Sequence, residues 1–468
     1  MRYTITFKTD DYKKLYDHLM SMSEEQAAYL LCGISRSSRE IRFLVREVIP
    51  VPSDILLKQG KDFITIPSTS YVPVLKKSSK TGQCFFLVHS HQNRFSVFSP
   101  VDDNEEPRII KPAYVWNEKG IHGSLVITRN NGLSARVWLE NGKSLVEEPI
   151  SLIRIVGQRY EFIVPNNATA LPSHMPEQFF DRQVRAFGKD LQQLLGNLHV
   201  GVVGAGGTGS AVIEQLARLG VGELTILDDD KIDGTNITRI HGSAMEDFKN
   251  GKYKVDVMEA MIDNIGFGTK VDSIPKNIMY RSAAEKLKDC DLILGCTDDH
   301  FGRMLLNQIS LKYYIPLIDM GVFINSDHGK IRNIDGRVSI VIPGNPCLLC
   351  TNCINQEKLK AEIEKMCDPE LYKKRVKEGY CPELDIEDPS VITFTTSIAS
   401  QAIIELIHLI TGFMGSDEDA ARILFIYDYR KFIEKLPPKP STCICDDPNA
   451  LGCGDQEPFL GLTWPTEV

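Results

Sequence analysis

Two histidines, a serine and an aspartate in the first third of the chain have a spacing that could hold a metal ion. They follow the apolar run Phe85–Val88 in the pattern H-x-H-x7-S-x2-D, formed by His89, His91, Ser99 and Asp102. Side chains two residues apart in an extended segment point to the same side, so both imidazoles can bind one ion. Two imidazoles, a carboxylate and a water form the open ligand set of a catalytic zinc, which lowers the pKa of the bound water. We therefore expect His89, His91 and Asp102 to bind a catalytic zinc ion.

A glycine-rich turn between an apolar run and a helical pattern marks a second candidate site. The apolar run is Val200–Val203, and the glycines that follow it are Gly204, Gly206, Gly207 and Gly209. Glycines let the backbone approach phosphates, and the following helix N-terminus offers N–H groups to them. Asp228 and Asp230 follow the next expected strand, where a carboxylate can bind a ribose hydroxyl. These features alone fit any nucleotide, including the cofactor of a dehydrogenase.

Polar residues farther along the chain distinguish ATP from a dinucleotide. They are Asn236, Arg239, Lys254 and Asp298, the last at the end of another expected strand. Cleavage of ATP builds negative charge on the transferring phosphorus, which cations stabilise, whereas hydride transfer needs no such cations. We therefore expect Arg239 and Lys254 to bind the phosphates and Asp298 to hold Mg²⁺.

The cysteines indicate a third site. Cys347 and Cys350 form a C-x-x-C pair, and Cys443 and Cys445 form a C-x-C pair near the end of the chain. Paired cysteines in a chain of this size predict metal binding rather than a disulfide scaffold. Four thiolates make a closed structural zinc site. Cys353 and Cys453 are the alternatives for one of the four ligands.

Length and composition frame these sites. A chain of 468 residues predicts two or three domains, and its net charge of −9 argues against nucleic acid as the main partner. No targeting segment is visible at the N-terminus, so we expect a cytoplasmic protein. The apolar run Val391–Ile410 includes polar residues, which favours a buried helix over a membrane span.

The expected elements divide an α/β chain into four parts. Residues 1–160 combine strand-like runs with helices expected over Asp10–Ser21 and Glu24–Cys32. A linker rich in proline and small polar residues is expected at 161–178. Strand–helix alternation then predicts a second domain at 179–445, followed by a tail at 446–468.

The histidine pattern resembles the JAMM/JAB metallopeptidases, which cleave peptide and isopeptide bonds at the C-termini of ubiquitin-like proteins. The resemblance implies a JAMM/MPN-like α/β domain in which Ser99 stabilises the oxyanion and an upstream glutamate is the general base. The family's spacing falls on Gln26, with Glu25 one residue earlier, and we favour Glu25 because the metal-binding residues are all present. The alternative is an inactive domain that binds a ubiquitin-like tail as a scaffold.

The second domain is similar to the ubiquitin-activating family in its broad sense, including the ThiF/MoeB-like adenylyltransferases. The shared motifs are D-x-D at Asp228, N-x-x-R at Asn236, G-x-x-K ending at Lys254, T-D at Thr297 and R-Q at Arg182. The resemblance implies a Rossmann-like fold with a mixed sheet and adenylation of a C-terminal carboxylate by ATP. It further implies that Asp230 binds the ribose and that Arg182 reaches the partner's site in a homodimer.

A catalytic thiol is the remaining question for this domain. Relatives that pass their cargo on as a thioester or persulfide carry a cysteine in the loop before the long apolar helix, where this chain has Cys381. Its thiolate could attack the adenylate carbonyl. Cys353 and Cys367 compete with it in the same region, and an adenylyltransferase without a thioester is an equal alternative.

Together the two resemblances predict a bifunctional enzyme that activates and cuts the tail of a ubiquitin-like, β-grasp protein. Its cofactors would be ATP, Mg²⁺ and two Zn²⁺ ions, one catalytic and one structural. We expect a bacterial conjugation system with a separate conjugating enzyme, no nucleic acid and no membrane, and a role in antiviral defence against phages. The alternative is activation of a sulfur carrier for sulfur-transfer biosynthesis.

Overall fold

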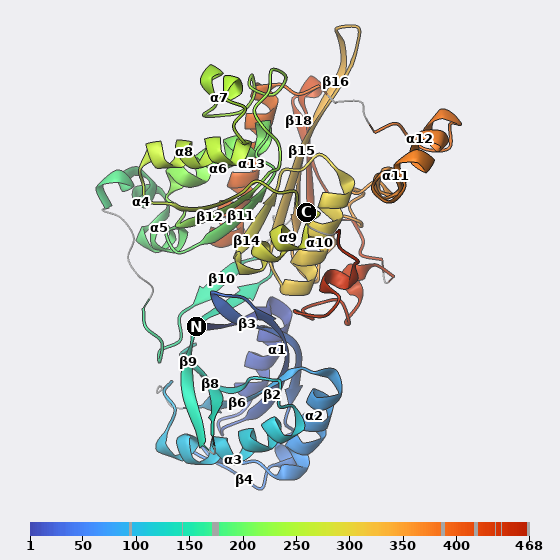
Figure 1. Cartoon of the computed structure of the whole chain (residues 1–468). Coiled ribbons are helices and arrows are strands. Elements are labelled where there is room, and N and C mark those ends of the chain that lie inside the picture. Colours follow the sequence, from blue (N-terminus) through green and yellow to red (C-terminus); the bar gives the residue numbers. More distant parts are fainter. Residues whose placement is uncertain are drawn as a thin grey trace. The chain divides into compact units, whose positions relative to one another are not determined.

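The computed structural model describes residues 1–92, 96–142, 144–170, 177–384, 389–415, 420–435, 437–440 and 442–465 (Figure 1). The chain forms two compact units. Unit 1 comprises Met1–Leu171, Lys312–Tyr314 and Pro448–Glu457, and unit 2 comprises Pro172–Leu311, Ile315–Asp447 and Pro458–Val468.

Unit 1 is built on one mixed eight-stranded sheet with the order β1-β3-β2-β6-β7-β8-β9-β10. Strand β1 also pairs with β9, so the sheet closes on itself. The strands are β1 (Arg2–Lys8), β2 (Ala27–Arg36), β3 (Glu40–Pro50), β6 (Cys84–His91), β7 (His122–Thr128), β8 (Leu133–Asn141), β9 (Ser144–Val156) and β10 (Tyr160–Ile163). A short hairpin joins β4 (Lys58–Gln59) to β5 (Ile64–Thr65).

Alternating side chains give this sheet two separate cores. Phe86 and Val88 of β6 belong to the core that includes residues of α1 (Thr9–Leu19). Phe85 and Leu87 belong to the other core, with residues of α2 (Ser68–Thr81) and α3 (Pro100–Trp116). Since the period of a strand is two residues, His89 and His91 continue the face covered by α3.

Strand β2 replaces the helix that the sequence predicts over Glu24–Cys32, so that prediction is wrong. The strand lies between β3 and β6, and its residues from Ala27 to Ser35 are all buried. A strand buried on both faces has a continuous apolar sequence, which periodicity cannot distinguish from a buried helix.

Unit 2 contains a second eight-stranded sheet with the order β13-β12-β11-β14-β15-β16-β17-β18. The strands from β13 to β15 pair in parallel, and β16 to β18 are antiparallel. They are β11 (His199–Val203), β12 (Glu223–Leu227), β13 (Lys270–Ile274), β14 (Leu292–Gly295), β15 (Leu317–Asp327), β16 (Lys330–Val341), β17 (Arg422–Ile426) and β18 (Lys431–Lys435). The strand order reverses between β11 and β14, and parallel sheets bind ligands at such switch points, beyond the carboxyl ends of the strands.

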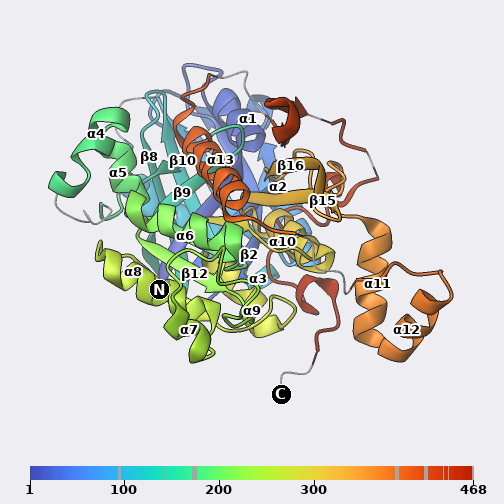
Figure 2. The same cartoon turned by 90° about the horizontal axis from the view of Figure 1, so that it is seen from above.

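Helices connect and cover this second sheet. Figure 2 shows α6 and α13 side by side, in agreement with their packing against each other. The helices are α4 (Asp181–Phe187), α5 (Lys189–Leu195), α6 (Gly207–Leu219), α7 (Met245–Lys249), α8 (Lys254–Ile265), α9 (Arg281–Lys286), α10 (His300–Tyr313), α11 (Gln356–Cys367), α12 (Pro369–Lys377) and α13 (Ile392–Thr411). By length and composition α13 is the one helix of the described residues that could span a membrane. It packs against α6, β15 and β16, as a core helix of this unit does.

The boundaries of the units differ from those that the sequence predicts. Strand β10 occupies the start of the linker expected at 161–178, because Tyr160–Ile163 pairs with the end of β9. Residues 171–176 of that linker and 466–468 of the expected tail lie outside the described residues. The tail expected at 446–468 contributes Pro448–Glu457 to unit 1, where Gly454 bridges to Ile34 of β2.

Candidate functional sites

The histidine and aspartate residues of unit 1 converge as the sequence predicts. The Nε2 atoms of His89 and His91 are 3.2 Å apart. Asp102 places Oδ1 3.2 Å from His89 Nε2 and Oδ2 3.5 Å from His91 Nε2. Ligand atoms of a tetrahedral zinc with bonds of 2.0–2.1 Å lie roughly 3.3 Å from one another. The three residues therefore fit a zinc ion without rearrangement.

The end of a strand and the start of a helix hold these ligands in place. His89 and His91 end β6, and Asp102 is in the first turn of α3. Ser99 caps that helix, because its Oγ accepts a hydrogen bond from Asp102 N at 3.2 Å and its own N–H donates to Asp102 Oδ2 at 2.6 Å. Such a reciprocal capping box fixes the helix N-terminus. Ser99 thus positions Asp102, and the oxyanion role of Ser99 stays a prediction.

The register of β2 distinguishes Glu25 from Gln26. Ala27, the first residue of β2, is paired with His89, and Ser90 N donates to Gln26 O at 3.0 Å, so the pairing continues one residue before the strand. Alternation then places Glu25 on the face of the two histidines and Gln26 on the opposite face. The Gln26 side chain accepts a hydrogen bond from Ser53 instead. Burial raises the pKa of Glu25 to about 7, against the opposing effect of His89 and His91. A carboxyl group with a pKa near neutrality suits a general base.

The glycine turn of unit 2 joins β11 to α6 and has the close approaches that require glycine. Gly204 has a φ of +94°, and a Cβ there would lie 2.7 Å from the carbonyl oxygen of Cys296. A Cβ on Gly209 would lie 1.8 Å from the carbonyl oxygen of Gly204. At Gly206, the N-cap of α6, a Cβ would meet no atom within 4 Å. The turn therefore packs tightly on its inner side and leaves space in front of the helix N-terminus.

The two aspartates of the D-x-D motif have different surroundings. Asp228 accepts hydrogen bonds from Ala205 N at 2.6 Å and Asp230 N at 2.9 Å, so it holds the glycine turn. Burial raises its pKa, while Lys254 and these N–H groups oppose that shift. The side chain of Asp230 is 68% exposed and accepts a hydrogen bond from Lys254 Nζ at 2.6 Å. Asp230 is therefore the better placed of the two to bind a ribose.

Asn236 and Arg239 lie on the loop after β12 and contribute differently. The Asn236 amide donates to Lys231 O and accepts from Asp233 N, both at 3.0 Å, so it shapes the turn. Arg239 lies over the start of α6, since a Cβ on Gly207 would be 3.2 Å from Arg239 Cδ. Arg239 thus brings a cation to the glycine turn, whereas the side chain of Asn236 is engaged by the backbone.

Lys254 and Asp298 complete the edge of the sheet. Lys254 begins α8 and is buried, with Nζ 3.6 Å from Asp228 and 2.6 Å from Asp230. Burial opposes its charge, but the carboxylates, including Asp298, raise the pKa of Lys254 overall. Asp298 is exposed just after β14, and Arg303 fixes its loop by donating to the Thr297 and Asp298 carbonyls at 2.6 and 3.1 Å. Cations and carboxylates therefore gather near the glycine turn.

Asp319 and Arg337 support this site, and the sequence did not lead us to predict either role. Asp319 is fully buried and pairs with Arg303 Nε at 3.3 Å and with Arg337 Nη2 at 2.6 Å. Asp319 thus fixes Arg303, whose guanidinium holds the Asp298 loop. A signal was present, because Asp319 follows an apolar strand-like run and so falls at the ligand-binding edge of a parallel sheet.

Arg182, predicted to act in a partner's site, and the three candidate catalytic cysteines are spread over unit 2. Arg182 is exposed on α4, and its predicted role involves a second chain. Cys381 is partly exposed and Cys367 is exposed at the end of α11. Cys353 is 2% exposed, with its Sγ 3.0–3.1 Å from the hydroxyls of Thr351 and Ser339. Burial makes Cys353 the least suited of the three thiols to reach a substrate.

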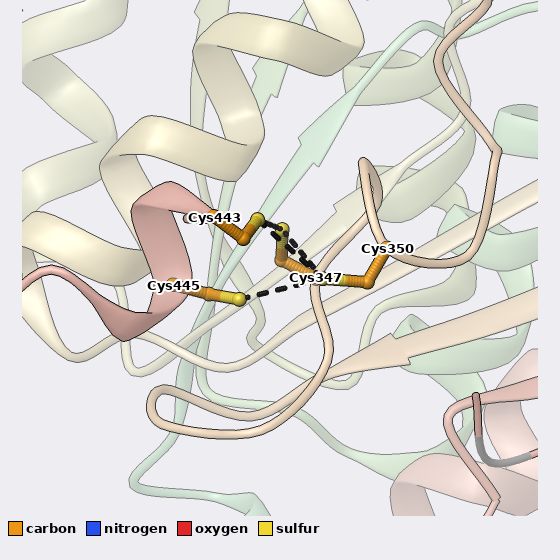
Figure 3. Close-up of side chains that lie close together, drawn as sticks. All are labelled: Cys347, Cys350, Cys443 and Cys445. Atoms are coloured by element: carbon orange, nitrogen blue, oxygen red, sulfur yellow. Dashed lines mark hydrogen bonds between the residues drawn. The ribbon is translucent and has the colours of Figure 1, made fainter. Parts of the chain in front are cut away.

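Four cysteines of unit 2 form a compact cluster (Figure 3). The contacts among Cys347, Cys350, Cys443 and Cys445 have Sγ–Sγ distances of 3.4–3.9 Å. Thiolates around a tetrahedral zinc with bonds of about 2.3 Å lie roughly 3.8 Å apart. The predicted set fits a closed structural site, and neither Cys353 nor Cys453 belongs to the cluster.

Comparison with protein families supplies the context of unit 2. The ThiF family matches residues 180–446, which is more than half of the chain. The chain belongs to the ThiF family. The ThiF match covers the glycine turn, the acidic motif, Lys254, Asp298 and the cysteine cluster. It does not include residues 1–179, so the JAMM-type character of unit 1 stays a prediction.

Curated relatives match parts of the chain. SAMP-activating enzyme E1 of Haloferax volcanii is 29% identical over 163 residues, covering 35% of this chain and 56% of that protein. Adenylyltransferase and sulfurtransferase UBA4 of Meyerozyma guilliermondii is 26% identical over 274 residues, covering 57% of each. Sulfur carrier protein ThiS adenylyltransferase of Bacillus subtilis is 26% identical over 164 residues, covering 35% of this chain and 46% of that protein. The chain thus spans about half the length of these relatives.

Proposed function

We propose that unit 2 adenylates the C-terminal carboxylate of a ubiquitin-like protein. The observation that carries this proposal is the grouping of Lys254, Arg239, Asp230 and Asp298 around the glycine turn of a ThiF-family sheet. The substrate carboxylate attacks the α-phosphate of ATP, an acyl-adenylate forms, and pyrophosphate leaves. Lys254 and Arg239 stabilise the developing negative charge, Asp230 binds the ribose, and Asp298 would hold Mg²⁺.

The ion pairs of Lys254 support this assignment. A buried ammonium group without a partner would be costly, and Asp228 and Asp230 compensate its charge. A bound triphosphate offers the same lysine a second set of oxygens. Lys254 can then turn from Asp230 toward phosphate, which leaves Asp230 free for the ribose.

We further propose that the activated carrier serves sulfur transfer. The names of two relatives refer to a sulfurtransferase and to a sulfur carrier protein, which favours this role over the conjugation expected from the sequence. Conjugation is the second candidate, favoured by the partly exposed Cys381, whose thiolate could take the acyl group as a thioester. Bacterial conjugation with antiviral defence has no support beyond the sequence.

For unit 1 we propose a zinc peptidase that cleaves at the C-terminus of the same carrier. Support comes from the spacing of its three ligand side chains and from Glu25 on their face of the sheet. Zinc held there would lower the pKa of a bound water and polarise the scissile carbonyl. Glu25 would accept the proton of that water and pass it to the leaving amine. A scaffold that binds the tail without cutting it is the alternative.

ATP–pyrophosphate exchange with a purified β-grasp carrier protein tests the adenylation. We expect exchange that depends on the carrier's free C-terminus and is lost in Asp298→Ala. Asp263→Ala, which removes an exposed carboxylate from α8, is the matched control and should keep full exchange. Exchange that is equal in both variants would refute the proposed magnesium ligand, and no exchange with any carrier would refute the adenylation.

Intact mass separates the two fates of the adenylate. With a sulfur donor present, sulfur transfer replaces one oxygen of the carrier's C-terminus by sulfur. Conjugation instead leaves a thiol-sensitive adduct of the carrier on this chain, which Cys381→Ser abolishes.

A further inference from the structure

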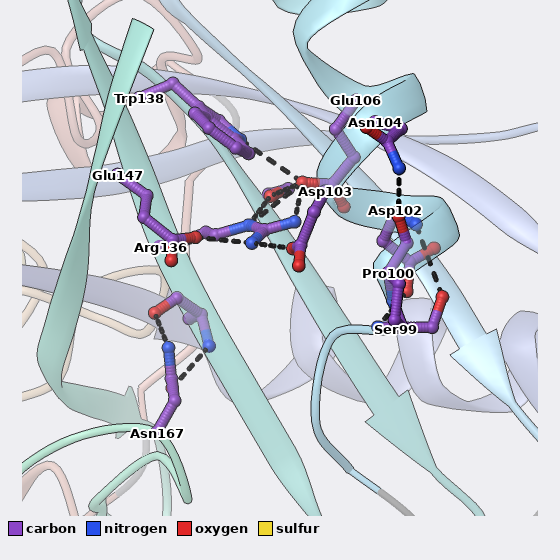
Figure 4. A network of polar contacts seen from close by, with 12 residues as sticks. Ser99, Pro100, Asp102, Asp103, Asn104, Glu106, Arg136, Trp138, Glu147 and Asn167 are labelled. Atoms are coloured by element: carbon purple, nitrogen blue, oxygen red, sulfur yellow. Dashed lines mark hydrogen bonds and ion pairs between the residues drawn. The ribbon is translucent and has the colours of Figure 1, made fainter.

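A buried ion pair lies beneath α3 in unit 1 (Figure 4). Arg136 of β8 and Glu106 of α3 are each 3% exposed, and Arg136 Nη2 is 2.8 Å from Glu106 Oε2. The same carboxylate oxygen accepts hydrogen bonds from Ser124 Oγ at 2.5 Å and Trp138 Nε1 at 3.2 Å. Taking two charges out of water costs free energy, which the ion pair and its hydrogen bonds must offset.

The register of the sheet places this pair beside the candidate zinc site. Ser124 is paired with Leu87 in β6 and with Arg136 in β8, so Arg136 shares the face of Leu87 and therefore of His89. Helix α3 covers this face and carries both Glu106 and Asp102, which are one turn apart. A shift of α3 would therefore move Asp102 relative to His89.

Arg136 holds the start of α3 at several points. It pairs with Glu106 and, at 2.6 Å, with Asp103, and it also contacts Glu147 of β9. Its guanidinium lies 3.7 Å from the centre of the Phe98 ring, just before the capping residue Ser99. One side chain thus contacts the segment before the cap and the first two turns of the helix.

Glu106 has a second oxygen that these contacts do not use. Among the described residues, Glu106 Oε1 is a buried atom without a hydrogen-bond partner. Arg136 and His89 both lie close enough to this carboxylate to interact with it electrostatically. Metal-bound histidines commonly donate their other ring N–H to a carboxylate, and loss of that partner costs about 10–100-fold in metal affinity.

We propose that Arg136 and Glu106 are positioning residues of the zinc site: Arg136 fixes α3 so that Asp102 reaches the histidines, and Glu106 orients His89. This inference rests on the proposed zinc site of unit 1. It assigns no contact with substrate to either residue, and it gives the buried pair a role in metal affinity.

The test measures zinc release from the full chain at increasing chelator concentration. Two release steps are expected, and His89→Ala identifies the step of unit 1. Glu106→Gln should move that step by about 10–100-fold toward weaker binding and leave the cysteine step unchanged. Arg136→Lys, which keeps the charge but loses the forked hydrogen bonding, should move it in the same direction.

Glu40→Gln is the matched control. Glu40 is also a buried carboxylate of unit 1, paired with Arg42 at 2.5 Å. Glu40 lies beside Ile41, which is paired with Arg36, the last residue of β2. His89 is paired with Ala27, the first residue of β2, so Glu40 and the zinc site lie at opposite ends of this strand. Glu40→Gln should leave zinc release unchanged. Excess zinc should restore cleavage in Glu106→Gln but not in Glu25→Gln.

The outcomes separate the inference from the function on which it rests. A wild-type chain without a step sensitive to His89 would refute the zinc site itself. Two normal steps in the wild type with no shift in Glu106→Gln would refute the positioning role alone. Equal shifts in Glu106→Gln and Glu40→Gln would also refute it, because they would show general destabilisation.

Discussion

The candidate sites of the two units differ in how their charged and metal-binding side chains are arranged. In unit 1 the ligand atoms of His89, His91 and Asp102 already have the spacing that zinc requires. In unit 2 Lys254 is paired with Asp230, and the Arg239 guanidinium donates to Thr235 O at 2.6 Å. The side chains of the proposed zinc site thus have their donor atoms in place, whereas the cations of the proposed nucleotide site are paired with a carboxylate or a backbone carbonyl.

The difference follows from how each site is built. Unit 1 takes its ligands from one strand end and one helix start, and the capping box of Ser99 fixes the helix start locally. Unit 2 gathers its charges from the ends of several elements distant in sequence. A local capping box can fix the spacing of nearby side chains, whereas buried charges from distant elements need one another as partners.

Substitution of Glu25, the proposed general base of unit 1, should give the largest effect. Glu25→Gln keeps the shape of the side chain but cannot accept a proton, so cleavage of a carrier precursor should fall by about 10²–10⁴-fold. Zinc content should stay at two ions per chain. Gln26→Ala is the neighbouring control and should cleave normally; the reverse pattern would reassign the base to the opposite face of β2.

Loss of the Lys254 charge should affect the proposed nucleotide site of unit 2 almost as strongly. Lys254→Met removes a charge that stabilises the phosphates, and pyrophosphate exchange should fall by about 10²–10³-fold. Lys252→Met, which removes the nearby exposed lysine paired with Asp247, should retain exchange. Equal exchange activity in the two variants would contradict the proposed role of Lys254 in phosphate binding.

Substitutions in the cysteine cluster compare the proposed structural zinc site of unit 2 with the proposed catalytic zinc site of unit 1. Cys445→Ser should release one zinc ion and lower the melting temperature of the chain by about 5 °C or more, since structural zinc contributes folding free energy. Cys453→Ser should keep both ions. Zinc loss in Cys453→Ser alone would show that the cluster uses a different fourth ligand.

The smallest effect is expected at a residue that the turn already engages. Asn236→Ala removes the two side-chain hydrogen bonds that shape the loop, at a cost of about 1 kcal/mol each. Thermal unfolding should detect this change, while exchange at saturating ATP should fall only a few-fold. A loss as large as that of Lys254→Met would mean that Asn236 contacts the nucleotide directly.

The sequence predicted these sites better than their surroundings. The His89–Asp102 group and the glycine turn have fixed local spacings, so their grouping could be read directly from the residues. The two cysteine pairs are far apart in the sequence, and their grouping was predicted from the four thiolates that a closed zinc site needs. Strand β2 could not, because a run buried on both faces has no periodicity. Asp319, Arg337 and the Arg136–Glu106 pair depend on which strands become neighbours. The choice of Glu25 over Gln26 likewise gained a physical reason only from the register of β2.

The most direct test of two separate sites assays one set of variants for both reactions. Wild type, Asp298→Ala and His89→Ala are each incubated with a C-terminally extended carrier precursor for cleavage, and with mature carrier for ATP–pyrophosphate exchange. Asp298→Ala should lose exchange and keep cleavage, and His89→Ala should lose cleavage and keep exchange. Loss of both activities in either variant, in a chain that remains folded, would contradict two independent sites.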